Sequence, residues 1–203
     1  MTNRFITVEN ANELPDLISD SDGVITDFST AFHRYMESVH GHLAHVNEPK
    51  NFNFSDAYPQ HPSPWQYIKE FINNTEFFGN MGLYPDAVSA IKSLHSAGVR
   101  VRIITSIGDS EEVKRARLNV YDREISAYID DVTFLPLASP KSDSLRKYDP
   151  SFFVDDLAKE CHGALESDHK PFLFHRRYNV SDPLEKSVTR LKSGWVDLPY
   201  FER

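Results

Sequence analysis

The sequence predicts a three-layer α/β sandwich built on a mostly parallel β-sheet, because short apolar runs alternate with longer segments of helical periodicity. Parallel strands are joined by crossover connections, which are usually helices, so this alternation is what such a sheet requires. The length of 203 residues is close to that of one domain with an insertion. A content of 40% hydrophobic and 26% charged residues is that of an ordinary globular protein with a substantial core.

Five apolar runs are predicted to form the strands. The second run alternates between polar and apolar residues and then becomes fully apolar, as expected of a strand that enters the core of a sheet. The other four runs are short. The predicted strands span residues 17–19, 99–105, 132–137, 152–154 and 172–174.

The helices between these strands begin and end at residues with typical capping chemistry. Pro85 begins one helix at a first-turn position, and Gly98 ends it. Asp109, followed three residues later by Glu112, resembles a capping box and predicts the start of the next helix. A last helix is expected over residues 182–194, from an Asp-Pro pair to a glycine.

Residues 29–81 interrupt the alternation. They contain a predicted helix over residues 29–45, a stretch rich in proline and asparagine, and a short helix over residues 65–73, without a strand signal. This pattern predicts a small helical insertion across one end of the sheet. The predicted division is a core of residues 1–28 and 82–203 and a cap of residues 29–81.

Charge and composition exclude several classes of partner. With 22 basic and 30 acidic residues the formal net charge is −8, which argues against binding to the phosphate backbone of long nucleic acid. No apolar run approaches the roughly 20 residues that cross a membrane, and no secretory signal is visible. The single cysteine, Cys161, allows no internal disulfide and no cysteine-based metal site. We expect a soluble, cytoplasmic protein; the oligomeric state stays open, with a homodimer as one option.

Two carboxylates follow the first predicted strand directly. Asp20 and Asp22 come after residues 17–19, and Gly23 permits a sharp turn behind them. In a doubly wound sheet, ligands bind outside the carboxyl ends of the strands, where these side chains would lie. Taken alone, the segment favours an ordinary turn, because aspartate, serine and glycine are common turn residues.

A second carboxylate pair occurs in the same context. Asp155 and Asp156 follow the short apolar run of residues 152–154. If the two strands end at the same edge of the sheet, the carboxylates that follow them would form an oxygen-rich pocket suited to Mg²⁺. The alternative interpretation is that Asp156 caps the helix that follows it.

Hydroxyl and ammonium groups lie between the two carboxylate pairs. The strand of residues 99–105 ends at Thr105, which Ser106 follows, and Lys141 stands in a Ser-Pro-Lys-Ser segment. These groups beside a metal ion would bind a phosphoryl group, although each of them alone is a common loop residue. The order of the four segments is more specific than any one of them.

This order resembles that of the haloacid dehalogenase superfamily of aspartate-nucleophile phosphatases. The residues that carry the resemblance are Asp20-Ser21-Asp22-Gly23-Val24, Ile104-Thr105-Ser106, Lys141 and Phe153-Val154-Asp155-Asp156. More narrowly, residues 14–198 are similar to the 5'(3')-deoxyribonucleotidase family. The looser matches to that family are Asp27-Phe28, Phe77-Phe78, Tyr84-Pro85-Asp86-Ala87, Leu173-Phe174, Tyr178-Asn179, Arg190 and Trp195.

The resemblance implies a Rossmann-like sandwich with a cap and a phosphatase mechanism. Asp20 would attack phosphorus, and Asp22 would protonate the leaving oxygen and then deprotonate the hydrolytic water. Mg²⁺ would be held by Asp20, the backbone carbonyl of Asp22 and the carboxylate of Asp156, with Asp155 orienting bound water. The groups implied for the transferring phosphoryl group are Thr105, Ser106 and Lys141.

The resemblance also implies a nucleoside monophosphate, such as a 5'(3')-deoxyribonucleotide, as substrate. Phe28 matches an aromatic position of the family and is the first candidate to line a base pocket. Phe52, Phe54 and Trp65 are further candidates, although these aromatic residues could equally form the core of the cap. Another small phosphate ester, or a phosphate-binding module without catalysis, remains an alternative. The intact Asp20 and Asp22 speak against the second, because a protein without catalysis has no need of both.

Two features are assigned to structure rather than to chemistry. His40, His42 and His45 suggest a metal cluster by composition, but positions i and i+2 of a helix diverge by about 200°. A solvated helix face is therefore favoured over a zinc site. Cys161 is interpreted as a small packed side chain, because no partner histidine can be assigned to it.

Overall fold

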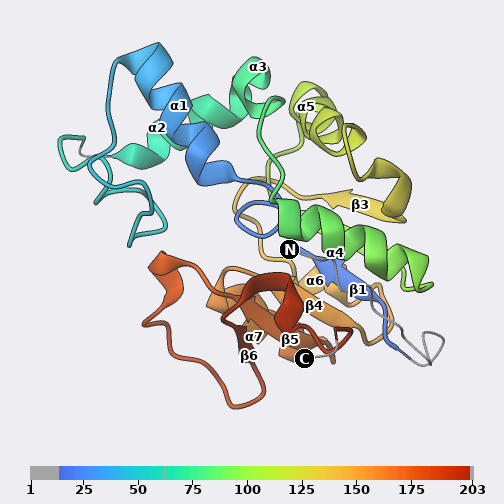
Figure 1. Ribbon diagram of the computed structural model, residues 1–203. Coiled ribbons are helices and arrows are strands. Elements are labelled where there is room, and N and C mark those ends of the chain that lie inside the picture. Colours follow the sequence, from blue (N-terminus) through green and yellow to red (C-terminus); the bar gives the residue numbers. More distant parts are fainter. Residues whose placement is uncertain (1–13, 62, 202–203) are drawn as a thin grey trace.

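The computed structural model describes residues 14–61 and 63–201, and its centre is a six-stranded sheet (Figure 1). All strand pairs in this sheet are parallel, and the strand order is β3-β2-β1-β4-β5-β6. The strands are β1 (Leu17–Ser19), β2 (Val101–Thr105), β3 (Asp131–Phe134), β4 (Phe152–Asp155), β5 (Lys170–Phe174) and β6 (Thr189–Leu191).

The first strand lies in the middle of the sheet. In β1, Leu17 pairs with Val101 of β2 on one side and with Phe152 of β4 on the other. The chain builds outwards from β1 in both directions, so the strand order reverses there. The carboxyl ends of β1, β2 and β4 therefore meet at one edge, where ligands of doubly wound sheets bind.

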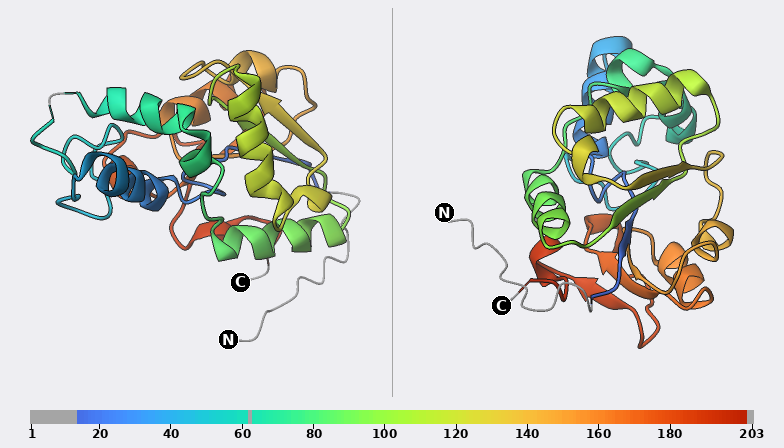
Figure 2. Two further views of the ribbon diagram at one scale, coloured as in Figure 1. Left: turned by 90° about the horizontal axis from the view of Figure 1, so that it is seen from above. Right: turned by 90° about the vertical axis from the view of Figure 1, so that its right-hand side faces the viewer.

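Helices cover both faces of the sheet, which confirms the predicted three-layer α/β sandwich (Figure 2, right). Leu17 faces a core cluster that includes helix α4 (Pro85–Ser96) and the 3-10 helix η4 (Gly194–Asp197). Ile18, the next residue, faces the opposite cluster with α6 (Ser142–Leu145) and α7 (Ala158–Leu165). Successive side chains of a strand point to opposite faces, so even this three-residue strand, whose side chains are all buried, serves both layers.

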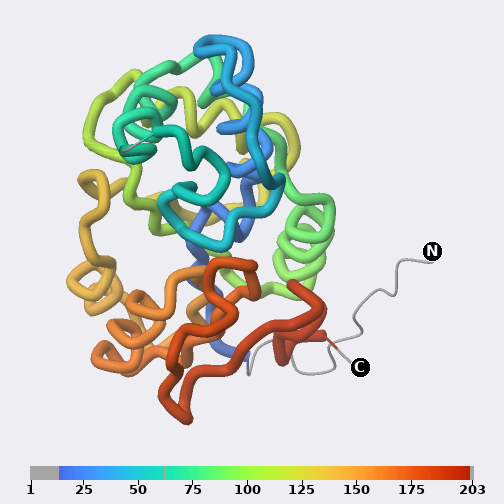
Figure 3. Tube along the Cα trace, turned by 90° about the vertical axis from the view of Figure 1, so that its left-hand side faces the viewer, coloured from blue at the N-terminus to red at the C-terminus, as the bar shows by residue number. Residues whose placement is uncertain are grey.

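The predicted cap region is helical in the part that the structure describes. Residues 29–61 and 63–81 contain no strand, and their helices are α1 (Phe28–His40), α2 (Pro64–Asn73) and α3 (Thr75–Phe78). These helices share one buried apolar cluster with α5 (Glu111–Asp122) of the core. The long loop between α1 and α2 reaches down to the 3-10 helix η3 (Arg177–Asn179), where the backbone carbonyl of Glu48 accepts a hydrogen bond from Arg177 (Figure 3).

Helix α1 ends earlier than predicted. Its N-cap is Asp27, whose carboxylate accepts a hydrogen bond from the backbone N–H of Thr30 at 3.2 Å. It ends at His40, because Gly41 adopts φ +70° and its N–H bonds back to the carbonyl of Glu37. The predicted extension to residue 45 was therefore wrong.

The predicted last helix was also wrong. Instead of a helix over residues 182–194, the chain forms the edge strand β6, in which Arg190 pairs with Leu173 of β5. Leu191 is fully buried in the core cluster on the α4 side of the sheet. Pairing with the open edge of β5 satisfies the backbone and buries Leu191 at once, which outweighs the local capping signal.

The N-cap of helix α5 lies one residue later than expected. The capping box expected at Asp109 does not form, since α5 starts after Ser110, whose hydroxyl donates instead to the Glu112 carboxylate at 2.8 Å. One further 3-10 helix, η2, spans Ser126–Tyr128. Among the described residues, no helix is long and apolar enough to cross a membrane.

Candidate active site

Three buried carboxylates meet at the carboxyl ends of β1 and β4. Asp20, Asp155 and Asp156 can each offer an oxygen within 4.8 Å of the others, and their residues are 7%, 0% and 3% exposed. The backbone N–H of Asp20 donates to the carbonyl of Val154 at 2.8 Å, so the sheet itself sets the spacing between the two strand ends. The two carboxylate pairs of the sequence thus supply one cluster.

Lys141 lies inside this cluster. Its Nζ is 2.6 Å from Oδ1 of Asp20 and 2.6 Å from Oδ2 of Asp155, and the residue is buried. Its backbone N–H donates to Oε2 of Glu160 at 2.9 Å, which fixes the loop from which the side chain extends. Burial alone would lower the pKa of the ammonium, but the two carboxylates raise it above its ordinary value, so the group stays charged.

The charges of the cluster do not balance. Burial raises the pKa of Asp20 to about 7 despite the opposing charge of Lys141. Burial also raises the pKa of Asp155, and that of Asp156 rises further because the charges of Asp155 and Asp20 add to the effect. Three carboxylates around one ammonium favour an additional cation.

The donor atoms fit Mg²⁺, which prefers a few hard oxygen ligands. Both oxygens of Asp155 are already used, by Lys141 and by the backbone N–H of Leu157 at 2.8 Å. Asp20 and Asp156 each keep one carboxylate oxygen without a hydrogen-bond partner among the described residues. These two side chains are therefore the better direct ligands, whereas Asp155 contacts Lys141, which in turn contacts Asp20.

Asp156 does not cap the helix that follows it. The N-cap residue of α7 is Leu157, and it is Asp155 that accepts the N–H of Leu157. Asp156 instead accepts a hydrogen bond on Oδ2 from the hydroxyl of Tyr178, while its backbone carbonyl accepts from Asn179. The capping alternative is thereby excluded.

The turn after β1 needs a glycine. Gly23 adopts φ +75°, and a Cβ atom there would lie 2.1 Å from Oδ2 of Asp156. Its carbonyl accepts a hydrogen bond from Nε of Arg176 at 2.6 Å. Residues 20–26, called here the Asp20 turn, are thus a true turn and also approach the carboxylate cluster closely.

Asp22 projects from the same turn, but to a different partner. Both of its carboxylate oxygens accept hydrogen bonds from the Arg117 guanidinium of α5, at 2.6 and 2.8 Å. Thr26 donates its hydroxyl to Oδ1 of Asp22 at 2.7 Å. The Asp22 side chain remains 25% exposed and lines the same cavity as Asp20.

Arg117 was missed at the sequence level. The only signal was an arginine at the helical spacing of Val113 and Val120, on the face of α5 that is buried against the cap. A charged residue on an apolar helix face points to a buried partner, but nothing in the sequence names that partner.

Two of the predicted phosphate-binding residues differ in their environment. Thr105, at the end of β2, is buried and lines the cavity. The hydroxyl of Ser106 donates to the carbonyl of Ser139 at 2.9 Å and so ties down the loop before Lys141. Of the two hydroxyls, that of Thr105 is the one available to a ligand.

An apolar cavity opens from the carboxylate cluster towards the cap. All four aromatic candidates line it, namely Phe28, Phe52, Phe54 and Trp65. Phe54 is only 4% exposed and packs on Phe32 at a ring distance of 4.8 Å, so most of it belongs to the cap core. Phe28 and Trp65 are half-buried, and Phe52 is 48% exposed.

The histidines are not arranged as predicted. His42 and His45 lie beyond the end of α1, so the expectation of one solvated helix face was wrong. His40 lies 3.5 Å from Oε2 of Glu70, and the ring of His42 packs on His61 with centroids 4.1 Å apart. Within the described ranges, the carboxylate cluster is the one group of three potential metal ligands that comes together. Cys161 is fully buried, as predicted for a packed side chain.

Comparison with known proteins identifies the fold. No protein-family model and no curated protein matches the sequence. A haloacid dehalogenase-like hydrolase from Streptococcus pneumoniae superposes with a TM-score of 0.58 at 14% identity, over 88% of this chain and 94% of that chain.

Two further solved structures have a similar fold. CbbY from Rhodobacter sphaeroides, in complex with phosphate, superposes with a TM-score of 0.59 at 14% identity, over 92% of this chain and 96% of that chain. L-2-haloacid dehalogenase from Xanthobacter autotrophicus gives a TM-score of 0.54 at 13% identity, over 79% and 77%. The chain therefore has the Rossmann-like α/β fold of the haloacid dehalogenase-like hydrolases.

Proposed function

We propose that this protein is a Mg²⁺-dependent phosphomonoesterase with Asp20 as its nucleophile. The observation that carries the proposal is the buried cluster of Asp20, Asp155 and Asp156 around Lys141, at one end of a cavity that Thr105 also lines. Phosphoryl transfer needs a nucleophile aligned with phosphorus and positive charge beside the negative oxygens of the transferring group. Asp20 and Lys141 of this cluster would supply them. The phosphate bound to the similarly folded CbbY is consistent with this proposal.

The reaction would proceed in two steps. A carboxylate oxygen of Asp20 attacks phosphorus, the new O–P bond forms, and the bond to the leaving oxygen breaks while Asp22 donates a proton to that oxygen. Water then attacks the phosphorus of the aspartyl-phosphate, and Asp22 takes a proton from it. Inorganic phosphate leaves and the Asp20 carboxylate is restored.

Other groups hold the transferring phosphoryl group. Lys141 and Thr105 would bind its oxygens, since the first carries a positive charge, the second a hydroxyl, and both line the cavity. Asp20 and Asp156, with the backbone carbonyl of Asp22, would hold Mg²⁺, which neutralises the charge of the carboxylates and of the substrate. Asp155 orients Lys141 through its 2.6 Å contact.

We infer that the substrate is a nucleoside monophosphate, such as a 5'(3')-deoxyribonucleotide. The cluster recognises only a phosphoryl group, so selectivity must come from the cavity walls. Phe28, Phe52 and Trp65 offer partly exposed aromatic surface there. Stacking of a nucleobase on an aromatic ring is worth about 1–3 kcal/mol.

Dehalogenation is the competing reaction, because the same fold occurs in the haloacid dehalogenase from Xanthobacter autotrophicus. Two observations favour a phosphate ester. A halide leaves without a proton, whereas an alkoxide needs the acid that Asp22 supplies. The additional buried carboxylates, Asp155 and Asp156, call for a cation that carboxylate attack on carbon does not require.

The test is a substrate panel with purified protein. It contains nucleoside monophosphates, sugar phosphates and 2-haloacids, each assayed with Mg²⁺ and with EDTA. We expect release of phosphate from the nucleotides that EDTA abolishes and Mg²⁺ restores, with slower turnover of the sugar phosphates. Halide release without phosphate release would assign the site to dehalogenation. If no compound of the panel is hydrolysed, a binding module without catalysis would be favoured.

A further inference from the structure

A buried arginine connects Asp22 to the elements that carry the cap. Arg117 is fully buried in α5. Its Nη2 donates to both carboxylate oxygens of Asp22, while its Nη1 donates to Oγ of Ser21 at 3.1 Å and to Oγ1 of Thr26 at 2.9 Å. One guanidinium therefore contacts three residues of the Asp20 turn.

The neighbours of Arg117 on α5 reinforce this arrangement. Tyr121, one turn further along, donates its hydroxyl to Oγ of Ser21 at 2.7 Å. On its other side the guanidinium lies 4.5 Å from the ring centroid of Phe78, at the end of the cap helix α3. The same side chain thus touches the turn that precedes the cap and the helix that closes it.

The bonds leave Asp22 little freedom. Nη2 of the planar guanidinium donates to both oxygens of Asp22, while its Nη1 donates to Ser21 and Thr26. The hydroxyl of Thr26 adds a third hydrogen bond to the same carboxylate. The part of the Asp22 side chain that remains exposed lines the cavity beside Asp20. Burying a guanidinium is costly, so the pair is better explained by the orientation it imposes than by stability.

We propose that Arg117 is a positioning residue that holds Asp22 at the cavity wall for proton transfer to the leaving oxygen. This inference rests on the proposed phosphomonoesterase function. Arg117 touches no substrate atom in this assignment and acts only through Asp22. Its effect should therefore depend on how much the leaving group needs a proton.

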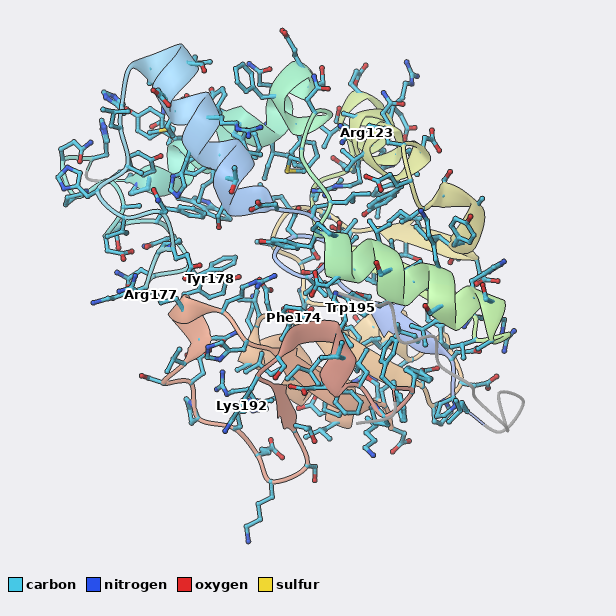
Figure 4. The ribbon with its side chains drawn as sticks, viewed as in Figure 1. Arg123, Phe174, Arg177, Tyr178, Lys192 and Trp195 are labelled. Carbon is cyan, nitrogen blue, oxygen red and sulfur yellow. The ribbon has the colours of Figure 1, made fainter. Side chains whose placement is uncertain are left out.

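The chain offers a matched control in Arg123, which is labelled in Figure 4. Arg123 directly follows α5, and its Nη2 donates to the backbone carbonyl of Met81, in the segment that returns from the cap. It thus ties the end of α5 to the cap region as Arg117 does, but it does not contact Asp22. A purely structural role predicts the same behaviour for both arginines.

The experiment compares Arg117→Met, Arg117→Lys and Arg123→Met on two substrates, in the full-length protein with Mg²⁺. The substrates are an alkyl phosphate, whose alkoxide needs a proton, and p-nitrophenyl phosphate, whose phenolate leaves without one. The quantity compared is kcat/KM, which reports only the steps up to formation of the aspartyl-phosphate, because Asp22 also acts in the hydrolysis of that intermediate, a step that both substrates share. General acid catalysis contributes about 10²–10⁴-fold, so we expect Arg117→Met to lower kcat/KM for the alkyl phosphate by at least about 10-fold. The loss in kcat/KM for p-nitrophenyl phosphate should stay below about 3-fold, because nitrophenolate leaves without a proton from Asp22.

The other variants separate orientation from folding. Arg117→Lys keeps the charge but loses the planar group that binds Asp22 and its neighbours in the Asp20 turn at once, so it should show the same leaving-group dependence at a smaller amplitude. Arg123→Met should change both substrates by the same factor. In an Asp22→Asn background, Arg117→Met should cause no further loss on the alkyl phosphate, because the group that it positions is already gone.

Equal losses on both substrates, full additivity with Asp22→Asn, or faster alkyl phosphate hydrolysis by Arg117→Met would each overturn the inference. The last result would mean that Arg117 keeps Asp22 away from the leaving group. If Arg117→Met does not fold, the Arg117→Lys ratio and its cycle with Asp22→Asn decide. Wild-type protein that hydrolyses neither substrate contradicts the proposed function itself, which is a different result from normal wild-type turnover with unselective variants.

Discussion

Asp20 and Asp22 stand two residues apart, yet each is surrounded by different groups. Asp20 shares its site with Lys141 and two other carboxylates, whereas Asp22 lies on Arg117 and Thr26. The sharp Asp20 turn makes this separation possible, since it directs neighbouring side chains to different strands and helices. Under the proposed mechanism, these different partners would suit two chemically identical groups to different roles, Asp20 as nucleophile and Asp22 as proton carrier.

We predict that Asp20→Asn abolishes turnover without unfolding the protein. Asparagine is nearly isosteric with aspartate but is not a nucleophile towards phosphorus. The loss in kcat should reach about three orders of magnitude or more, as for other nucleophile deletions. Phosphate release and the thermal midpoint should be measured on the same preparation. A variant with wild-type rates would contradict the aspartyl-phosphate mechanism.

The two carboxylates that follow β4 should differ in their effect on the metal. We expect Asp156→Ala to raise the Mg²⁺ concentration for half-maximal activity by more than 100-fold or so, and Asp155→Ala by about 10–100-fold, as for residues that orient ligands. The reason is that Asp155 already uses both oxygens on Lys141 and Leu157. Asp143→Ala, in the exposed ion pair with Arg146, is the control. The reverse order would exchange the two roles.

At the scale of the elements, the cap is expected to determine the substrate. Phe28, the first residue of α1, lines the cavity and packs edge-on against Phe71 at 5.1 Å. Its position joins the Asp20 turn to the cap core. Helix α1 begins beside the Asp20 turn and packs in the apolar cluster of the cap. We therefore expect its first residues to contact the leaving group of the substrate.

Phe28→Ala should lower kcat/KM for a nucleoside monophosphate by one to two orders of magnitude, the rate equivalent of about 1–3 kcal/mol of stacking. A phosphate ester without a ring should lose little. Phe77→Ala is the matched control, because Phe77 packs in the same cap cluster on Tyr35 but lines a separate cavity. Equal losses on both esters would make Phe28 a packing residue and weaken the nucleotide assignment.

The sequence was sufficient to predict those strands whose hydrophobic pattern matches their burial in the sheet. The buried strands β1, β2, β4 and β5 appear as apolar runs because both of their faces are covered. Strand β6 does not, because only Leu191 of its residues is buried, and an Asp-Pro pair upstream imitates a helix start. Its strand conformation follows from pairing with β5, which is a tertiary effect.

For the site, the same distinction holds. Carboxylates that directly follow strands could be placed together, because parallel strands end at one edge. The loop sequence around Lys141 does not show where its side chain points, because contacts of that loop with Ser106 and Glu160, which are distant in sequence, hold it where the ammonium reaches Asp20. Arg117 reaches Asp22 from another helix, across 95 residues of sequence, and no local pattern encodes such a contact.

At the scale of the whole molecule, the carboxylate cluster should make stability depend on pH. Burial raises the folded-state pKa of Asp20 from 3.8 to about 7, and that of Asp156 is also raised. The folded state therefore binds more protons than the unfolded state between these values, and stability contributed by the cluster falls as pH rises through that window. Above this pH window the buried carboxylates of the candidate active site therefore lower the free energy of unfolding.

We predict that Mg²⁺ raises the thermal midpoint more at pH 8 than at pH 5, because the ion binds ionised carboxylates in the folded state. Asp156→Asn should raise the midpoint of the metal-free protein at pH 8 and remove most of the Mg²⁺ effect. Thermal scans at both pH values, with EDTA or Mg²⁺, measure this. A midpoint that Mg²⁺ leaves unchanged at pH 8 would contradict the assigned ligands.

The central position of β1 also governs when the molecule can fold. Its Leu17 has no strand partner until Val101 of β2 has been synthesised, and the second edge of β1 stays open until Phe152 of β4 follows. Strand β1 therefore precedes both of its partners in the chain and has neighbours on both sides only once β4 has been made. Pairings so distant in sequence make folding slow and leave an apolar strand edge open during synthesis. Growing chains shorter than about residue 155 are consequently the forms most exposed to aggregation and most dependent on chaperones.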